Sequence, residues 1–215
     1  MLKMIKKLTC LFIFITSCFT IFSCTNEPAI ILSPLPENAL VLALGDSLTF
    51  GSGVKTQAQS YPSVLASLIQ RKVINAGYPG IDSANLLKKT PALLNEYQPN
   101  LVILCVGGND MLRHVNDKTI QYNIEKIVEM IRMKGIDILL IAVPKPGLFF
   151  LNPAKFYKEI AHQFNIPLEE DTLTDLESDA QYKSDSIHLN AKGYAKLAQA
   201  IASELMRLGA IRQRA

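Results

Sequence analysis

Short apolar runs alternate along this chain with longer segments in which apolar residues recur every three or four positions. The short runs have the length of β-strands, and the longer segments have the periodicity of amphipathic helices. Such alternation is typical of parallel strands joined by crossover helices, and it predicts an α/β domain. Strands are expected at residues 40–44, 72–75, 101–106, 136–143 and 166–168, and helices at 61–70, 84–97, 119–134, 154–164 and 190–208.

The first residues of the chain have the composition of an export signal. Lys3, Lys6 and Lys7 precede an apolar stretch over residues 8–22, and polar residues follow from Thr25. About 15 apolar residues are few for a membrane-spanning helix, which needs roughly 20, and no basic stop-transfer cluster follows them. We therefore predict a signal peptide over residues 1–24 and export to the periplasm or cell envelope. An uncleaved membrane anchor is the alternative.

Cysteines in this segment suggest a lipid anchor, because lipoprotein signals place a small residue before the cysteine that is acylated. Cys24 ends the sequence Ile-Phe-Ser-Cys, in which the phenylalanine is unusually bulky, whereas Cys18 ends the better-matching sequence Ile-Thr-Ser-Cys. Cleavage at Cys18 would leave the apolar residues Phe19, Ile21 and Phe22 exposed, so we expect lipidation at Cys24. Secretory cleavage without a lipid is the alternative.

One folded domain is expected after the signal. Residues 25–38 contain three prolines, which is typical of an extended tether, and the domain is predicted over residues 39–215. The net charge of +3 equals that of the three signal lysines, so the remaining chain carries 19 basic and 19 acidic residues. A near-neutral chain without a basic stripe gives no reason to expect a nucleic-acid partner, and membrane contact is expected only through the lipid. We expect a monomer.

Cys105 is the one cysteine outside the predicted signal. It therefore has no partner for a disulfide within the domain. Its place in the apolar run 101–106 is typical of a small buried hydrophobic residue, and we assign it no catalytic role.

A glycine-flanked serine follows the first predicted strand. Ser47 lies in the sequence Gly-Asp-Ser-Leu-Thr-Phe-Gly over residues 45–51. In parallel sheets the carboxyl ends of the strands border the ligand crevice, and glycines allow the sharp turn that presents a side-chain oxygen there. Ser47 is a candidate nucleophile, although a serine in this place can equally cap a helix or fill a turn.

Asp185 and His188 stand three residues apart, just before the last predicted helix, for which Asn190 is a candidate N-cap. A serine hydroxyl needs a base to take its proton, and that base needs a partner that fixes its tautomer. His188 and Asp185 fit these two roles. The alternative is an aspartate near a helix start beside a surface histidine.

Two further loops follow predicted strands at the same edge of the sheet. Asn109 lies in Gly-Gly-Asn-Asp over residues 107–110, and its amide can donate a hydrogen bond to the oxyanion of an acyl transfer. The sequence Asn-Ala-Gly-Tyr-Pro-Gly over residues 75–80 offers Gly77 or Gly80 as a backbone donor. Ordinary turns are the alternative for both loops.

These four segments, in this order, resemble the sequence blocks of the SGNH (GDSL-type) hydrolases. Gly45-Asp46-Ser47-Leu48 is similar to the family's first block, Gly80 to its glycine, Gly107-Gly108-Asn109-Asp110 to its third block and Asp185-Ser186-Ile187-His188 to its last. The stretches NAGYPG, PALLNEYQPNLVILCVGGND and SDSIHLNAKGY resemble in particular the bacterial periplasmic thioesterase, arylesterase and lysophospholipase enzymes.

The resemblance implies a flavodoxin-like three-layer α/β/α fold with a five-stranded parallel sheet. It also implies a serine ester hydrolase without metal or cofactor, acting on acyl esters, lysophospholipids or thioesters through an acyl-enzyme. Ser47, His188 and Asp185 would be the triad, and Ser47, Gly80 and Asn109 the oxyanion hole; Gly80 is preferred to Gly77 from the motif.

Candidates for an acyl-chain pocket are Leu112, Leu148, Phe149 and Phe150, for which core or lid packing is the alternative. A carbohydrate O-acetyl esterase or acetyltransferase is the second enzymatic hypothesis. A lipoprotein that uses the fold only for binding is the third hypothesis. The intact set of serine, asparagine, aspartate and histidine argues against a loss of catalysis.

Overall fold

The computed structural model describes residues 30–145 and 151–212. Within them, five parallel strands form one sheet in the order β2-β1-β3-β4-β7. This is the flavodoxin-like order, in which the chain direction across the sheet reverses between β1 and β3. The strands are β1 (Leu40–Gly45), β2 (Lys72–Gly77), β3 (Leu101–Cys105), β4 (Asp137–Ile141) and β7 (Leu168–Glu169).

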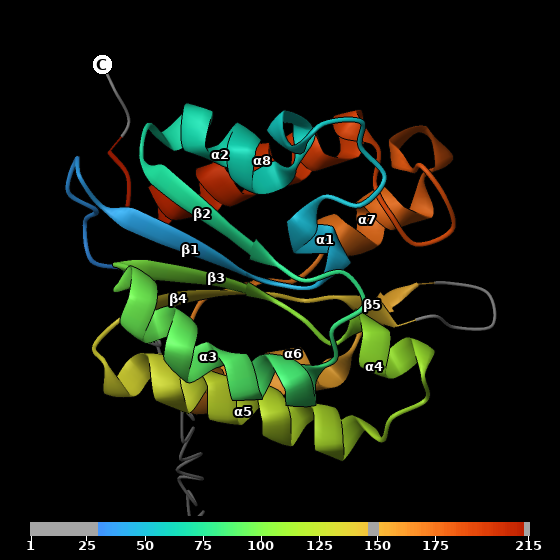
Figure 1. The fold of residues 1–215 in the computed structure, drawn as a ribbon, viewed down its shortest axis with the longest axis horizontal. Coiled ribbons are helices and arrows are strands. Elements are labelled where there is room, and N and C mark those ends of the chain that lie inside the picture. The colour runs from blue at the N-terminus through green and yellow to red at the C-terminus, as the bar shows by residue number, and fades with distance from the viewer. Residues whose placement is uncertain (1–29, 146–150, 213–215) are drawn as a thin grey trace, which may run out of the picture.

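Helices cover both faces of the sheet, so the predicted three-layer α/β/α architecture is confirmed (Figure 1). Helices α2 (Tyr61–Ile69) and α8 (Ala191–Arg207) pack together on one face. On the other face α5 (Asp117–Met133) contacts both α3 (Ser83–Tyr97) and α6 (Lys155–Phe164).

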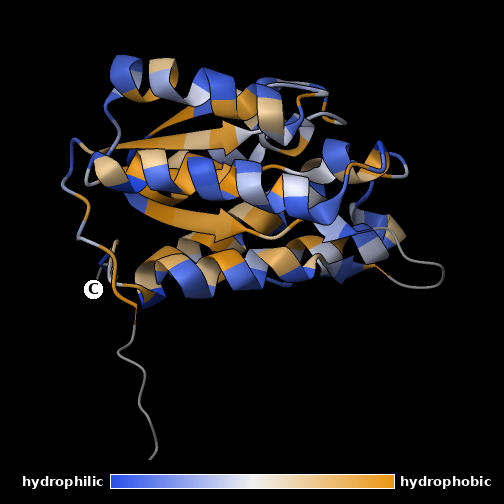
Figure 2. Cartoon of the chain, turned by 90° about the horizontal axis from the view of Figure 1, so that it is seen from below, coloured by the Kyte–Doolittle hydropathy of each residue, from blue (hydrophilic) through white to orange (hydrophobic). Residues whose placement is uncertain are grey.

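Hydrophobic burial explains this layering. Every residue of β3 is buried, as expected for a central parallel strand with helices on both sides. Each helix instead has one apolar face: in α5, the buried residues Ile120, Ile124, Ile127 and Ile131 recur at helical spacing. Figure 2 shows that the strands are apolar and lie between helices whose outward faces are hydrophilic. Complete burial of such a side chain contributes roughly 1.5–3 kcal/mol.

Several short elements are absent from the sequence prediction. They are α1 (Ser47–Phe50), α4 (Gly108–Leu112), α7 (Thr172–Ser178), the hairpin of β5 (Pro144–Lys145) and β6 (Asn152–Pro153), and the 3₁₀ turns Gln57–Gln59 and Ala180–Tyr182. Elements of about one or two turns are too short to show a helical period. β4 also ends at Ile141, before the predicted residue 143, because the chain then enters the hairpin.

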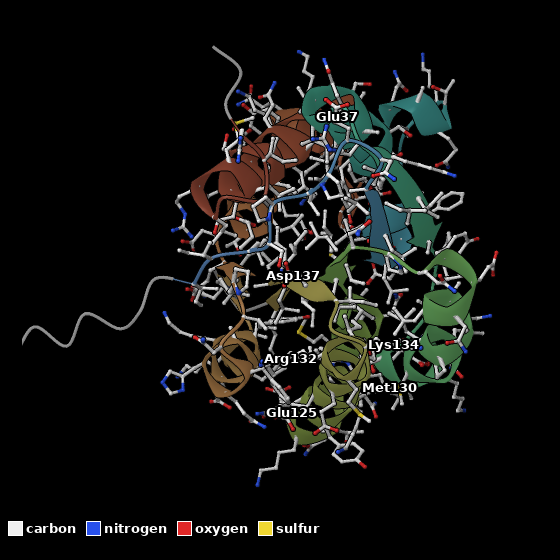
Figure 3. The ribbon with its side chains drawn as sticks, turned by 90° about the vertical axis from the view of Figure 1, so that its left-hand side faces the viewer. Glu37, Glu125, Met130, Arg132, Lys134 and Asp137 are labelled. Atoms are coloured by element: carbon white, nitrogen blue, oxygen red, sulfur yellow. The ribbon has the colours of Figure 1, made fainter. Side chains whose placement is uncertain are left out.

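The segment before β1 packs against the domain, although the sequence predicts a tether up to residue 38. Leu32 and Leu35 are buried, and their N–H groups donate to the carbonyls of Leu208 (2.9 Å) and Ala210 (2.8 Å). The Ser33 N–H donates to Asp137 Oδ2 at 2.7 Å, and Figure 3 shows Asp137 at the start of β4. The prolines keep this segment extended, but its leucines bury apolar surface, so the folded domain begins before residue 39.

The predicted signal peptide, with Cys24 and Cys18, lies outside the described residues. In the two described ranges, no helix is both long enough and apolar enough to cross a bilayer.

Candidate active site

A pocket lies at the carboxyl edge of the sheet, where the strand order reverses. Figure 1 shows α1, α4, α7 and β5 gathered at this end. In open parallel sheets this reversal leaves a crevice in which ligands bind. The pocket has a volume of about 210 Å³ and is lined by Asp46, Ser47, Leu48, Gly108, Asn109, Leu112, Val143, Pro144, Leu151, Glu177, Ser186 and Ile187.

Ser47, His188 and Asp185 form a chain of hydrogen bonds beside this pocket. Ser47 Oγ lies 3.0 Å from His188 Nε2, and His188 Nδ1 lies 2.8 Å from Asp185 Oδ2. When Nδ1 carries the ring proton it donates to the carboxylate, and Nε2 can then accept the serine proton. Ser47 and His188 are 141 positions apart in the sequence. The fold brings them together with Asp185.

The Asp185 carboxylate is held by its own loop. Its Oδ1 accepts hydrogen bonds from the N–H groups of Ile187 and His188, each at 2.9 Å. Burial acts to raise the pKa of Asp185, but the Ile187 N–H, the His188 ring and the His188 N–H together hold that pKa below its usual value. The group therefore stays ionised near neutral pH and fixes the orientation of the imidazole.

Asn190 anchors the loop that carries Asp185 and His188. Its Oδ1 accepts from the N–H groups of Lys192 (2.9 Å) and Gly193 (3.1 Å), so it is the N-cap of α8, as predicted. Its Nδ2 donates to the carbonyls of Gln181 (2.8 Å) and Lys183 (3.0 Å). One side chain therefore ties the last helix to the chain on the other side of the loop.

Asp46 is the N-cap of α1, the short helix that begins at Ser47. Its buried side chain caps α1 by accepting the Leu48 N–H at 3.0 Å, which leaves Ser47 at the first helical position. Burial is the main reason that the pKa of Asp46 rises to about 7. No role of its own was predicted for this residue from the sequence, although an aspartate directly before a short helix is a capping signal.

Asn109 and Gly80 lie close together. Asn109 Nδ2 donates to the carbonyl of Ile81 at 3.0 Å, which uses one of its two amide hydrogens. Gly80 has a φ of 78°, and its carbonyl accepts from Arg113 Nη2 at 2.9 Å. Among the hydrogen bonds of the described residues, the N–H groups of Ser47 and Gly80 have no acceptor.

Gly77 lies where the backbone of α1 leaves no room for a side chain. Its N–H donates to Asn75 Oδ1 at 3.0 Å. A Cβ at Gly77 would lie 2.1 Å from the backbone nitrogen of Phe50, so a side chain there would push α1 away. Gly77 thus allows β2 to pack against α1, while its N–H is already used.

A buried polar network lies behind Asn109. Asp110 accepts from the Ser83 N–H (2.8 Å) and the Ser83 hydroxyl (2.7 Å), and Asn123 Nδ2 donates to Ser83 Oγ at 2.9 Å. The network joins α4, α3 and α5. The sequence does not predict this network, because its members are distant in the chain. The one local signal is the aspartate of the Gly-Gly-Asn-Asp motif.

The remaining predicted site residues divide into two groups. Leu112 lines the pocket, whereas Leu148, Phe149 and Phe150 lie outside the described residues. Glu177, on α7, also lines the pocket and was not predicted from the sequence. Cys105 is buried in β3, where burial raises the pKa of its thiol. In the part of the chain that the structure describes, no three His, Cys, Asp or Glu side chains are grouped to hold a metal ion.

Comparisons with known proteins show what the chain is similar to. A model of the GDSL-like Lipase/Acylhydrolase family matches residues 43–196. Thioesterase 1/protease 1/lysophospholipase L1 of Escherichia coli is 29% identical over 175 residues, which cover 78% of this chain and 84% of that protein. An arylesterase of Vibrio mimicus is 30% identical over 135 residues, covering 60% of this chain and 65% of that protein. A crystal structure of TesA has a TM-score of 0.72 at 26% identity, covering 79% of this chain and 99% of that chain.

Proposed function

The chain belongs to the GDSL-like lipase/acylhydrolase family and is an ester hydrolase of that family, and from this premise we propose that Ser47, His188 and Asp185 are its catalytic triad. One observation carries the proposal. The Ser47 hydroxyl, the His188 ring and the Asp185 carboxylate form a continuous hydrogen-bonded chain, with distances of 3.0 and 2.8 Å, at the wall of a pocket. This is the arrangement that nucleophilic catalysis by serine needs.

The reaction follows from these contacts. His188 Nε2 takes the hydroxyl proton as Ser47 Oγ attacks the ester carbonyl, and the Asp185 carboxylate stabilises the imidazolium that forms. His188 then gives the proton to the departing alcohol or thiol, which leaves an acyl-enzyme. A water molecule, deprotonated by His188, attacks the acyl carbonyl and releases the acid and the free serine. His188 is the base and the acid in every one of these proton transfers.

We assign the oxyanion hole to the N–H groups of Ser47 and Gly80 and to the Asn109 amide. Three observations support this. The two N–H groups have no acceptor among the described residues, and Asn109 retains a second amide hydrogen. The alternative donor, the Gly77 N–H, is engaged by Asn75. A preorganised donor of this kind contributes about 100-fold to 1,000-fold in rate.

We propose carboxylic esters of acyl chains, lysophospholipids or thioesters as the substrates. The names of the relatives, thioesterase, lysophospholipase and arylesterase, support this range. Apolar side chains dominate the pocket wall, among them Leu112 of α4 and Leu151. Such a wall favours an acyl group over a charged ligand.

A sugar O-acetyl esterase or acetyltransferase is the second candidate. The size of the pocket favours it: about 210 Å³ is below the roughly 300–1,000 Å³ of a typical small-molecule site, so a short acyl group fits best.

Hydrolysis of p-nitrophenyl acetate, butyrate, octanoate and palmitate, a palmitoyl thioester and an acetylated sugar separates the candidates. Ser47→Ala is the control. Equal rates for enzyme and variant on all of them would refute the proposal, and so would no turnover, which would favour a binding protein.

We also propose that the protein is exported and anchored through a lipid on Cys24, as a monomer. The support is the sequence of residues 1–24, with its lysines, apolar stretch and terminal cysteine. Intact mass of the membrane-extracted protein tests the anchor. A mass of residues 24–215 plus acyl chains is expected, and an unmodified N-terminus would refute lipidation.

A further inference from the structure

Glu177 is a buried carboxyl that the proposed reaction does not use. It lies on α7, its residue is 8% exposed, and it lines the same pocket as Ser47 and Asn109. Among the described residues, no hydrogen bond to its side chain is found, and none contributes to its pKa. The carboxyl oxygens of Glu177 are not among the fully enclosed atoms that lack a partner, so they face the pocket and can bond to whatever fills it.

The surroundings of Glu177 favour the neutral acid. Burial is the main cause that raises its pKa to about 8; Asp46 and Asp185 raise it further, while Lys183 lowers it. Near neutral pH the side chain is therefore a carboxylic acid, whose O–H can donate a hydrogen bond.

Two of the other polar side chains of the pocket are bonded within the protein, whereas Asn109 keeps one amide hydrogen and no hydrogen bond of the Ser186 hydroxyl is found among the described residues. Asp46 accepts the Leu48 N–H, and Ser47 is bonded to His188. Most of the remaining wall is apolar, including Leu112, Val143 and Ile187. Glu177 is thus one of few free donors in a mostly apolar wall, and such a donor distinguishes ligands by whether they carry an acceptor at the matching place.

We propose that Glu177 is a specificity-determining residue, whose carboxylic acid donates a hydrogen bond to a neutral oxygen within the acyl group of the substrate. The inference rests on the proposed function, since it needs an acyl group bound beside Ser47. The substrate class is then narrowed to esters of short acyl groups that carry an ether, hydroxyl or carbonyl oxygen. Plain alkyl esters are turned over less efficiently, because they leave the buried acid without a partner.

An oxygen placed at successive positions of the acyl chain tests this proposal. The substrates are p-nitrophenyl methoxyacetate, 3-methoxypropanoate and 4-methoxybutanoate, each paired with its all-carbon isostere: butanoate, pentanoate and hexanoate. For each pair, the ratio of the two kcat/KM values is compared between the wild-type enzyme, Glu177→Gln and Glu177→Met. Intrinsic differences in ester reactivity cancel, because the same pair is used with each enzyme.

We expect the ratio for at least one oxygen position to be about tenfold higher in the wild type than in Glu177→Met, with the difference mainly in KM. Glu177→Gln should keep much of the preference, because an amide also donates. A test without any variant is the pH dependence. The wild-type ratio should fall above pH 8, where the acid ionises and can no longer donate. Titration of the triad changes kcat/KM by the same factor for both esters of a pair, so it cancels in their ratio.

Three results would overturn the inference. Equal ratios in the wild type and Glu177→Met at every oxygen position would remove Glu177 from specificity and leave the ester hydrolase intact. A wild-type preference that persists unchanged above pH 8 would refute the neutral donor even if Glu177→Met failed to fold. Absence of turnover on all six esters would refute the proposed function together with this inference.

Discussion

The His188 ring is held from one side by a carboxylate with several partners. Asp185 Oδ2 contacts Nδ1 while its Oδ1 accepts two backbone N–H groups, so the carboxylate cannot rotate without losing several hydrogen bonds. The three-residue spacing of aspartate and histidine in the sequence is enough to predict this contact. The burial of Asp46 and Glu177 was not predictable, because a carboxylate in the sequence gives no indication of its burial, which depends on how α1 and α7 pack.

Replacement of Asp185 by asparagine should lower kcat by about 10³-fold to 10⁴-fold, with little change in KM. The amide is nearly isosteric, but its NH₂ group can turn toward Nδ1 and favour the wrong ring tautomer. Steady-state kinetics on p-nitrophenyl butyrate measures the effect, and circular dichroism checks the fold. A loss of less than tenfold would show that Asp185 does not orient the histidine.

Asn109→Ala should lower kcat by about 100-fold to 1,000-fold, because one donor to the oxyanion is lost in the transition state. The variant should still bind substrate with a similar KM. Asn95→Ala, an exposed position on α3, is the matched control and should retain full activity. Activity near the wild-type value in Asn109→Ala would remove Asn109 from the oxyanion hole.

At the scale of elements, the long amphipathic helices and the buried strands were predictable and the short elements were not. The apolar residues of α5 repeat over four turns, whereas α1, α4 and α7 are too short for any period to appear. These short helices line the pocket. The sequence motifs therefore located most of the candidate site, but not the pocket wall formed by α7.

Asn190 has two separable roles, as the cap of α8 and as the anchor of the loop before it. Asn190→Ala should lose both and be destabilised by about 1–2 kcal/mol, with reduced activity. Asn190→Ser should recover most of the stability, since serine is a good N-cap, but not the bonds to the carbonyls of Gln181 and Lys183.

Urea unfolding and kcat, measured on both variants, separate the two roles. If the serine variant recovered activity as fully as stability, the loop anchor would have no part in positioning His188.

At the scale of the whole molecule, the topology of the sheet brings the site together. The strand order could be expected from the family resemblance, and the structure confirms it. It places the loops after β1 and β3 side by side at the switch point. The start of the folded domain was less predictable: three prolines indicated a tether, but the burial of Leu32 and Leu35 depends on the end of α8, which is distant in sequence.

The buried acid Glu177 should make global stability fall as pH rises. Its pKa is about 8 in the folded protein against an ordinary value of 4.5, so the folded state holds its proton more tightly than the unfolded chain. The stability linked to this proton is present below pH 4.5 and is lost as pH rises toward 8. Glu177→Gln removes the effect.

The melting temperature of Glu177→Gln should therefore exceed that of the wild type by several degrees above pH 8, and the gap should shrink toward about pH 5. Scanning calorimetry across this range measures it. Glu159→Gln, exposed on α6, is the matched control. A gap that does not change with pH would contradict the assignment of a neutral buried acid.

The identity of the nucleophile is tested most directly by covalent trapping. A fluorophosphonate reacts with an activated serine by forming an oxygen–phosphorus bond and releasing fluoride, and mass spectrometry of the digested protein locates the adduct. We predict one adduct, on Ser47, formed in step with the loss of esterase activity, absent from Ser47→Ala and slowed at least about 100-fold in His188→Ala. An adduct on another residue, or full esterase activity in Ser47→Ala, would contradict the account.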